Sequence, residues 1–300
     1  MTYSVVLLGA TGAIGSKIAL KLAKHQDQLG RVAFLTPTAN SGPEKEAKYD
    51  AVPIPRVVGD YEDPKSYQGF DIVISAVGDP LCEAQIKYID AAFEGGAQHF
   101  YPAEFGADLT NEVAHGESYF ANKVKVRNYL EEKVRNDPTK GYTYIMTSLF
   151  SDFMIQYNIL FLSEDKKSAN FLGKPDALLT TTYSDDVGGI TVLSLLPTHL
   201  KALNERREIR FSGSTLTIAQ YFATVSRVLG HDINVQYLSK ESSYAYEEEQ
   251  KASGNEFMYR FTSARRVLGF GDSVMLNPDN DSYPELKPVT WEETVKLLLD

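Results

Sequence analysis

Two side chains that can exchange a proton stand four residues apart in a segment with a helical pattern, residues 117–134. At 100° per residue, one stripe of this helix holds five residues, namely Tyr119, Lys123, Val126, Leu130 and Val134. Because the stripe is mostly apolar, it predicts the buried face, whereas Lys125 and Asn128 fall on the solvent side. A buried amine releases its proton more readily than an exposed one, and a tyrosine one turn away can reach it. The pattern makes Tyr119 and Lys123 candidates for a proton-transfer pair, but such spacing is common by chance, and a lysine that reaches solvent beside a core tyrosine fits it as well.

A glycine-rich turn, Gly9-Ala-Thr-Gly12-Ala-Ile-Gly15, lies between an apolar run at residues 5–8 and a helical pattern at residues 14–22. Glycines permit a tight turn and a close approach of the backbone to a pyrophosphate. The following helix offers free N–H groups and a positive dipole end to that anion. The alternative is a turn that merely needs small residues, but the strand–turn–helix setting favours a dinucleotide site. Its predicted members are Gly9, Thr11, Gly12, Ala13, Ile14 and Gly15.

The end of the second apolar run, residues 32–35, indicates which dinucleotide binds. It is followed by Thr36 and Pro37, with no acidic residue to hold the ribose 2′-hydroxyl of NAD. A 2′-phosphate would not be repelled there, and Thr36, Thr38, Ser41 and Lys45 are candidates to meet it. We therefore favour NADP(H) over NAD, although Lys45 is equally compatible with a solvated lysine.

Short apolar runs alternate with helical patterns through the first half of the chain. The predicted strands are residues 5–8, 32–35, 57–58, 71–77, 99–101 and 142–148. Six such alternations predict an α/β fold with a doubly wound parallel sheet. We expect residues 1–150 to form the dinucleotide-binding domain and residues 151–300 a smaller substrate-binding lobe, partly interleaved with the sheet.

Large apolar side chains follow the fifth and sixth predicted strands, at the carboxyl edge where such sheets bind ligands. They are Phe105, Phe150, Phe153, Met154 and Tyr157. Aromatic residues there suit a flat, apolar substrate, and the alternative is a core that joins the two lobes.

The composition excludes several classes of protein. The 300 residues are 43% hydrophobic and 23% charged, as in ordinary soluble proteins, and the net charge of −10 disfavours nucleic acid. No apolar stretch long enough to span a membrane is present. The single cysteine, Cys82, fits a reducing compartment, so we expect a cytoplasmic protein. The five histidines are dispersed, which predicts no metal site.

Several segments in the right order resemble a known family. They are Asp71-Ile-Val-Ile-Ser-Ala-Val-Gly78, then Gln85, then Phe100-Tyr-Pro-Ala-Glu-Phe-Gly-Ala-Asp108, together with the opening glycine turn. The chain thereby resembles the isoflavone reductase-like branch of the NmrA-like proteins, which are atypical short-chain dehydrogenases. A segment at Ser184-Asp-Asp-Val-Gly188 is also similar. Two departures are Ala103 in place of a serine and Thr36 in place of a basic residue.

The resemblance implies a Rossmann-type NADP(H) domain and reductases that pass hydride to conjugated or benzylic carbons of phenolic compounds. The family's catalytic lysine falls on Lys123, in the stretch Phe120-Ala-Asn-Lys123. Tyr119 is additional to the family's pattern and is either a second proton donor or a packing residue. The resemblance places the nicotinamide near Gly78, Pro102 and Lys123. Cofactor contacts are thus also expected at Ala76, Val77, Gly78, Pro102 and Lys123.

We therefore expect an NADPH-dependent reductase acting on a small conjugated or aromatic molecule, as a monomer or homodimer. Lys123, with or without Tyr119, would donate a proton or stabilise an oxyanion. One alternative is a non-catalytic NmrA-like protein that senses the dinucleotide's redox state and regulates a protein partner. Another is a redox-neutral isomerase or cyclase on the same fold.

Overall fold

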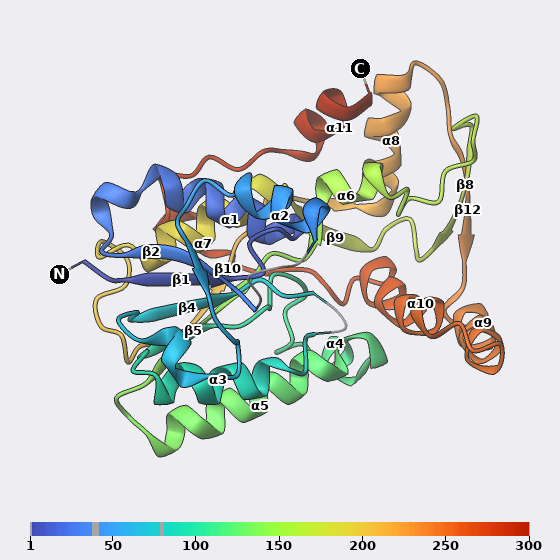
Figure 1. Ribbon diagram of the computed structural model, residues 1–300. Helices are drawn as coiled ribbons and strands as arrows, with labels where there is room; N and C mark the ends of the chain where they lie inside the picture. The colour runs from blue at the N-terminus through green and yellow to red at the C-terminus, as the bar shows by residue number, and fades with distance from the viewer. Residues whose placement is uncertain (1, 38–41, 79–80, 300) are drawn as a thin grey trace. The chain divides into compact units, whose positions relative to one another are not determined.

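The computed structural model describes residues 2–37, 42–78 and 81–299 (Figure 1). Its chain divides into two compact units, which are interleaved along the sequence. Unit 1 comprises Met1–Phe105, Asn122–Ile145 and Asp185–Ile209, and unit 2 comprises Gly106–Ala121, Met146–Ser184 and Arg210–Asp300. The functional division predicted at residue 150 stays a prediction. Among the described residues, no helix is both long enough and apolar enough to cross a membrane.

A seven-stranded parallel sheet forms the centre of unit 1. In spatial order its strands are β10 (Arg206–Arg210), β6 (Gly141–Met146), β5 (His99–Tyr101), β4 (Ile72–Ser75), β1 (Val5–Leu8), β2 (Val32–Thr36) and β3 (Arg56–Val58). Strand β1 pairs in parallel with both β2 and β4, so that Leu8 lies opposite Leu35 on one side and Ser75 on the other. The α/β, doubly wound, Rossmann-type fold is therefore confirmed.

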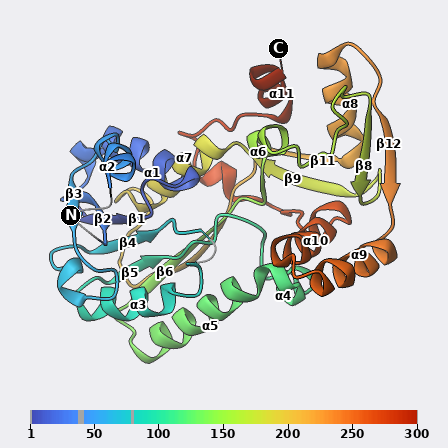
Figure 2. The same ribbon diagram turned by 45° about the vertical axis from the view of Figure 1, so that its right-hand side comes forward.

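Helices cover both faces of this sheet. Figures 1 and 2 show α1 (Ala13–Lys24) and α7 (Ser184–Leu195) on one face, and α3 (Gln85–Glu94) and α5 (Ala121–Asn136) on the other. The remaining helices of unit 1 are α2 (Pro43–Asp50) and the short η1 (Gln26–Gln28) and η2 (Pro64–Tyr67). Central strands read as continuous apolar runs because both of their faces are buried. Val6, Val73, Ile89 and Leu130 join one buried core between the sheet and the α3–α5 layer.

Unit 2 has two small sheets and a separate core. Strand β9 (Leu178–Thr182) lies between β11 (Ser214–Thr217) and β7 (Leu149–Phe150), and β12 (Asn234–Leu238) pairs in parallel with β8 (Ser168–Leu172). Its longer helices are α8 (Ile218–Leu229), α9 (Lys240–Ala252), α10 (Glu256–Gly269) and α11 (Trp291–Leu299). The shorter ones are α4 (Glu112–Gly116), η3 (Ser118–Phe120), α6 (Ser151–Gln156) and η4 (Asp279–Ser282). Leu179, Tyr221, Phe222 and Trp291 are central to the core of this unit.

The long helix predicted over residues 117–134 begins later than expected. Residue Glu117 is extended, η3 follows it, and α5 starts at Ala121. The reason is tertiary: the Tyr119 N–H donates to Ser263 Oγ at 2.9 Å, and the Glu117 carboxylate pairs with Arg266 at 2.7 Å. Local periodicity does not reveal these partners. The predicted stripe holds from α5 onward, where Val126, Leu130 and Val134 are buried.

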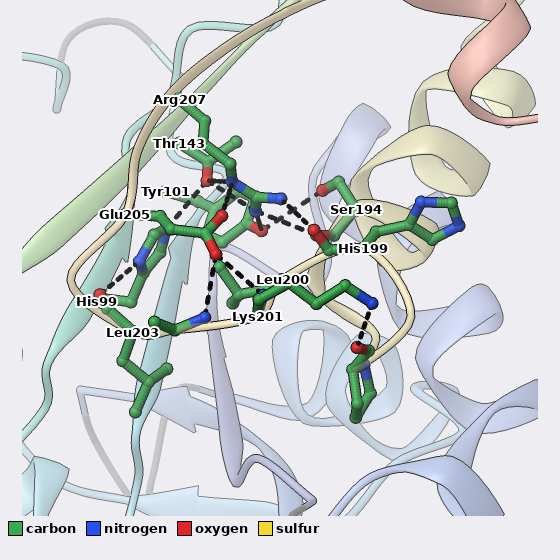
Figure 3. A network of polar contacts seen from close by, with 12 residues as sticks. His99, Tyr101, Thr143, Ser194, His199, Leu200, Lys201, Leu203, Glu205 and Arg207 are labelled. Atoms are coloured by element: carbon green, nitrogen blue, oxygen red, sulfur yellow. Dashed lines mark hydrogen bonds and ion pairs between the residues drawn. The ribbon is translucent and has the colours of Figure 1, made fainter.

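A buried polar network fastens the β10 edge of the sheet to the segment after α7 (Figure 3). The guanidinium of Arg207 donates to Thr143 Oγ1 at 2.9 Å, to Tyr101 Oη at 2.8 Å and to the Ser194 carbonyl at 2.9 Å. His99 Nδ1 lies 2.7 Å from the Leu203 carbonyl, so this nitrogen carries the proton, and Nε2 accepts from Thr143 Oγ1 at 2.8 Å. Burial lowers the pKa of His99 to about 3, so the ring is neutral.

The neutral His99 makes stability depend on pH in a defined direction. Its pKa is about 3 in the fold and 6.5 ordinarily, so the unfolded chain binds the extra proton, and stability falls as the pH drops from 6.5 toward 3. Between pH 7.5 and pH 5 the loss is about 2 kcal/mol. Asn cannot titrate, so His99→Asn lacks this pH dependence. The free energies of unfolding of the wild type and of His99→Asn, measured with urea, should therefore approach each other by about 2 kcal/mol from pH 7.5 to pH 5. If the free energy of unfolding has the same pH dependence in both proteins, His99 is not the buried neutral group that we infer.

Candidate functional site

The glycine turn between β1 and α1 is packed against the end of β4. Gly9 has φ +76°, and a Cβ built on it would lie 2.6 Å from the carbonyl oxygen of Ala76. A Cβ on Gly15 would overlap the carbonyl oxygen of Gly9. The turn therefore brings the predicted residues Gly9, Gly15 and Ala76 into contact. A side chain at Gly9 or Gly15 is excluded because backbone atoms occupy the space of its Cβ.

The N-terminus of α1 is open to an anion. Thr11, Gly12 and Ala13 are exposed, no side chain caps the helix, and its first turn carries no acidic residue. Free N–H groups and the positive dipole end therefore face outward without a competing carboxylate. A cavity of about 230 Å³ adjoins this turn, lined in part by Thr11, Ser16 and Lys48. Ile14, the other predicted member, is half-buried in the first turn of the helix.

At the end of β2 the structure adds a residue that our sequence reasoning missed. Thr36 is buried, and Arg56, at the start of β3, donates from Nε to Thr36 Oγ1 at 3.0 Å. The same guanidinium pairs with Glu46 at 2.5 Å. Lys45 is exposed, with its ammonium 5.9 Å from the Tyr49 ring. The sequence does contain one indication of Arg56: it is a basic residue at the start of β3, the strand that pairs with β2. The predicted Thr38 and Ser41 lie outside the described residues.

The turn after β5 is strained and is held by its neighbours. Phe105 has φ +30°, an unfavourable value for a bulky residue, although its side chain is buried. The buried amide of Gln85 accepts from the Ala103 N–H at 2.8 Å and donates to the Cys82 carbonyl at 2.9 Å. Pro102 precedes this turn and is buried. Gln85 thus connects the segment after β4 to the segment after β5.

Lys123 lies in the first turn of α5 and is half-buried. Its ammonium group donates to the backbone carbonyl of Glu104, in the strained turn. Its neighbours on the helix behave as predicted, because Lys125 and Asn128 are exposed. Lys123 therefore lies at the end of β5, while Val77 and Gly78 follow β4, the neighbouring strand in the sheet. Gly78 is exposed, with open space where a side chain would be.

Tyr119 belongs to unit 2 rather than to the helix that carries Lys123. Its ring packs at 5.1 Å from Phe120 and 6.5 Å from Phe261, and the Arg260 guanidinium lies 5.9 Å from it. These contacts provide a packing role for the tyrosine. Its role in proton transfer stays a prediction.

The predicted substrate residues fall into two groups. Phe150, Phe153 and Tyr157 form an edge-to-face series with ring centroids 5.0 Å apart, ending at Tyr157, which is 65% exposed. Met154, by contrast, is buried in the core of unit 2, and Phe105 is buried in unit 1. Only the first group presents aromatic surface to solvent. In the described parts of the chain, no three histidine, cysteine or acidic side chains gather to hold a metal ion.

A glycine turn and an open helix N-terminus after β1, with a lysine at the end of β5, define a Rossmann-type α/β protein with a turn suited to a dinucleotide. The NmrA-like family matches residues 1–293, and the chain belongs to this family. A phenylcoumaran benzylic ether reductase from Pinus taeda is 28% identical over 254 residues, covering 79% of this chain and 78% of the relative. These findings confirm the resemblance predicted from the motifs.

Solved structures agree on the fold. A crystal structure of isoflavone reductase matches with a TM-score of 0.80 and 24% identity, covering 100% of both chains. The binary complex of leucoanthocyanidin reductase with NADPH from Vitis vinifera matches with a TM-score of 0.77 and 21% identity, covering 98% of this chain and 99% of that one.

Substitution of Gly9 tests the close approach in the glycine turn. We expect Gly9→Ala to lower the free energy of unfolding by about 1–2 kcal/mol for its positive φ. The collision with Ala76 should add about 1–3 kcal/mol. Gly254→Ala is the matched control, because Gly254 has φ +75° and open space around it. Urea denaturation of both variants measures the difference; equal losses would show that the contact with Ala76 is not tight.

Proposed function

We propose that this protein is an NADPH-dependent reductase of a small phenolic molecule with a conjugated or benzylic carbon. The observation that carries the proposal is the Lys123 ammonium, held at the carboxyl end of β5 in the same unit as the glycine turn. Family membership and the reductase relative from Pinus taeda support the same activity.

The residues of unit 1 fit a dinucleotide. The absence of side chains at Gly9 and Gly15 lets the turn pack closely against backbone, and the uncapped N-terminus of α1 that follows would bind the charge of a pyrophosphate. Arg56 and Thr36 would bind the 2′-phosphate, and the solved NADPH complex of the same fold supports this choice of cofactor. Ala76, Val77, Gly78 and Pro102 would border the nicotinamide. NADPH, when bound, supplies a hydride.

Lys123 would supply the proton. A hydride that reaches a conjugated carbon leaves negative charge on the substrate's oxygen or ring, and a nearby ammonium stabilises or protonates it. The Glu104 carbonyl accepts one of the three N–H bonds of Nζ, which orients the group and leaves two donors for substrate. We propose Tyr119 as a second donor and the partly exposed Phe150, Phe153 and Tyr157 as substrate contacts, whereas Phe105 and Met154 are buried.

Cofactor preference is the first test. In a fluorescence titration we expect NADPH to bind at least about tenfold more tightly than NADH, which is about 1.4 kcal/mol. Arg56→Ala should remove this preference and leave NADH binding unchanged, since only the 2′-phosphate needs the guanidinium. Glu46→Gln should tighten NADPH binding, because it removes a carboxylate that competes for Arg56.

Lys45→Ala is the control for the cofactor test, because Lys45 is an exposed cation near the same strand end. If Lys45→Ala rather than Arg56→Ala removes the preference, the assignment of Arg56 is wrong. Tight binding of the oxidised dinucleotides irrespective of the 2′-phosphate would instead support a redox sensor.

Turnover is the second test. NADPH oxidation is measured with an isoflavone and with a phenylcoumaran as probes. Lys123→Ala should lower kcat by about 10²–10⁴-fold, because a general acid is lost. The Kd of NADPH should change less than about threefold, since the pyrophosphate and 2′-phosphate contacts remain. Lys125→Ala removes an exposed lysine of the same helix and should keep full activity. Activity that survives in Lys123→Ala would exclude this mechanism.

A further inference from the structure

We propose that Glu104 and Arg127 form a buried ion pair that positions the Lys123 ammonium for proton transfer. This inference rests on the proposed role of Lys123. It assigns Glu104 and Arg127 as positioning residues, because they act through the lysine and its turn rather than on substrate.

Both charges of the pair are removed from water. Glu104 is 2% exposed and Arg127 is 5% exposed. Arg127 Nη1 lies 3.7 Å from Glu104 Oε2, and its Nη2 donates to Glu208 at 2.9 Å. The guanidinium also lies 4.2 Å from the centre of the Tyr144 ring, which contributes a cation–π contact. Burying two ions costs more than burying an apolar pair of the same size, so stability alone does not account for them.

Residue Glu104 connects this pair to the lysine. Its carboxylate faces Arg127, and its backbone carbonyl accepts a hydrogen bond from Lys123 Nζ. Lys123 and Arg127 are four residues apart on α5 and therefore share one side of the helix. Helix α5 thus contacts Glu104 twice: Arg127 pairs with its carboxylate, and Lys123 donates to its backbone carbonyl.

The strain of the turn explains why two points are needed. Phe105, directly after Glu104, holds φ +30°. A backbone in such a region persists only when its surroundings over-determine it. Gln85 holds the turn at Ala103, and Arg127 holds it at Glu104. Release of Arg127 should let the Glu104 peptide relax, and the acceptor that orients Lys123 would then move.

The experiment combines kinetics with a measurement that needs no substrate. Glu104→Gln keeps the shape of the side chain and removes its charge, and Arg127→Met removes the guanidinium. For each variant, kcat with the isoflavone and phenylcoumaran probes and the Kd of NADPH are measured. In parallel, acetic anhydride labels the folded proteins, and mass spectrometry gives the labelling rate of Lys123 relative to the exposed Lys125.

We expect kcat to fall about tenfold or more in each variant while the Kd of NADPH changes less than about threefold. The double variant should be no slower than the slower single one, because both residues act through one turn. The Lys123 to Lys125 labelling ratio should rise at least about threefold, and Arg127→Lys should restore part of both quantities. Arg135→Met makes the same substitution at an exposed position of α5 and should change neither quantity.

Two outcomes overturn the inference. An unchanged labelling ratio in both Glu104→Gln and Arg127→Met shows that the pair does not position Lys123. A kcat equal to that of the wild type in both variants also shows that the pair does not position Lys123. If the wild type oxidises no NADPH with either probe but the labelling ratio rises as expected, the positioning role stands and the proposed reduction fails. Glu104→Gln keeps the test valid if Arg127→Met does not fold.

Discussion

The parallel pairing of β1 with β2 on one side and β4 on the other is the constraint on which the site depends. It places the ends of these strands at one edge of the sheet, so that the segments after Leu8, Leu35 and Ser75 emerge together. The contact between Gly9 and the Ala76 carbonyl follows from this pairing, and it leaves no room for a side chain in the turn. At the end of β1, this edge of the sheet is therefore formed by closely packed backbone, which suits the binding of a pyrophosphate.

Two arginines of unit 1 are removed largely or partly from solvent: Arg127 on α5 is buried, and Arg207 on β10 is half-buried. Arg207 and the neutral His99 share Thr143 as a partner, and this network fastens β10 and the segment after α7 to the sheet. Arg127 instead reaches the strained turn that contacts Lys123. Arg207 donates hydrogen bonds to several partners, whereas Nη1 of Arg127 has no hydrogen-bond partner among the described residues and pairs with Glu104 only at 3.7 Å. In our proposal, only Arg127 is connected to a group that takes part in the reaction. We propose that this connection distinguishes the Arg127 contacts, which bear on function, from the Arg207 network, which is structural.

Much of the site could be predicted because its signals are local. The glycine spacing in Gly9–Gly15 and the apolar stripe of Val126, Leu130 and Val134 follow from φ preferences and helical periodicity. Arg56 could not be found this way, because its link to Thr36 depends on the pairing of β3 with β2. Tyr119 was placed on the wrong element because Ser263 and Arg266, more than 140 residues away, hold the segment before α5 out of the helix.

The sequence by itself determined the parallel α/β fold, the dinucleotide turn and the presence of Lys123 on the apolar side of its helix. These depend on residue type and spacing within short segments. Only the tertiary structure decided that β10 and α7 join the first unit, and that Glu104, Arg127 and Lys123 meet at one strained turn. The physical reason is that a buried charge is stabilised by whichever partner the fold brings within a few ångströms, and sequence distance does not report that partner.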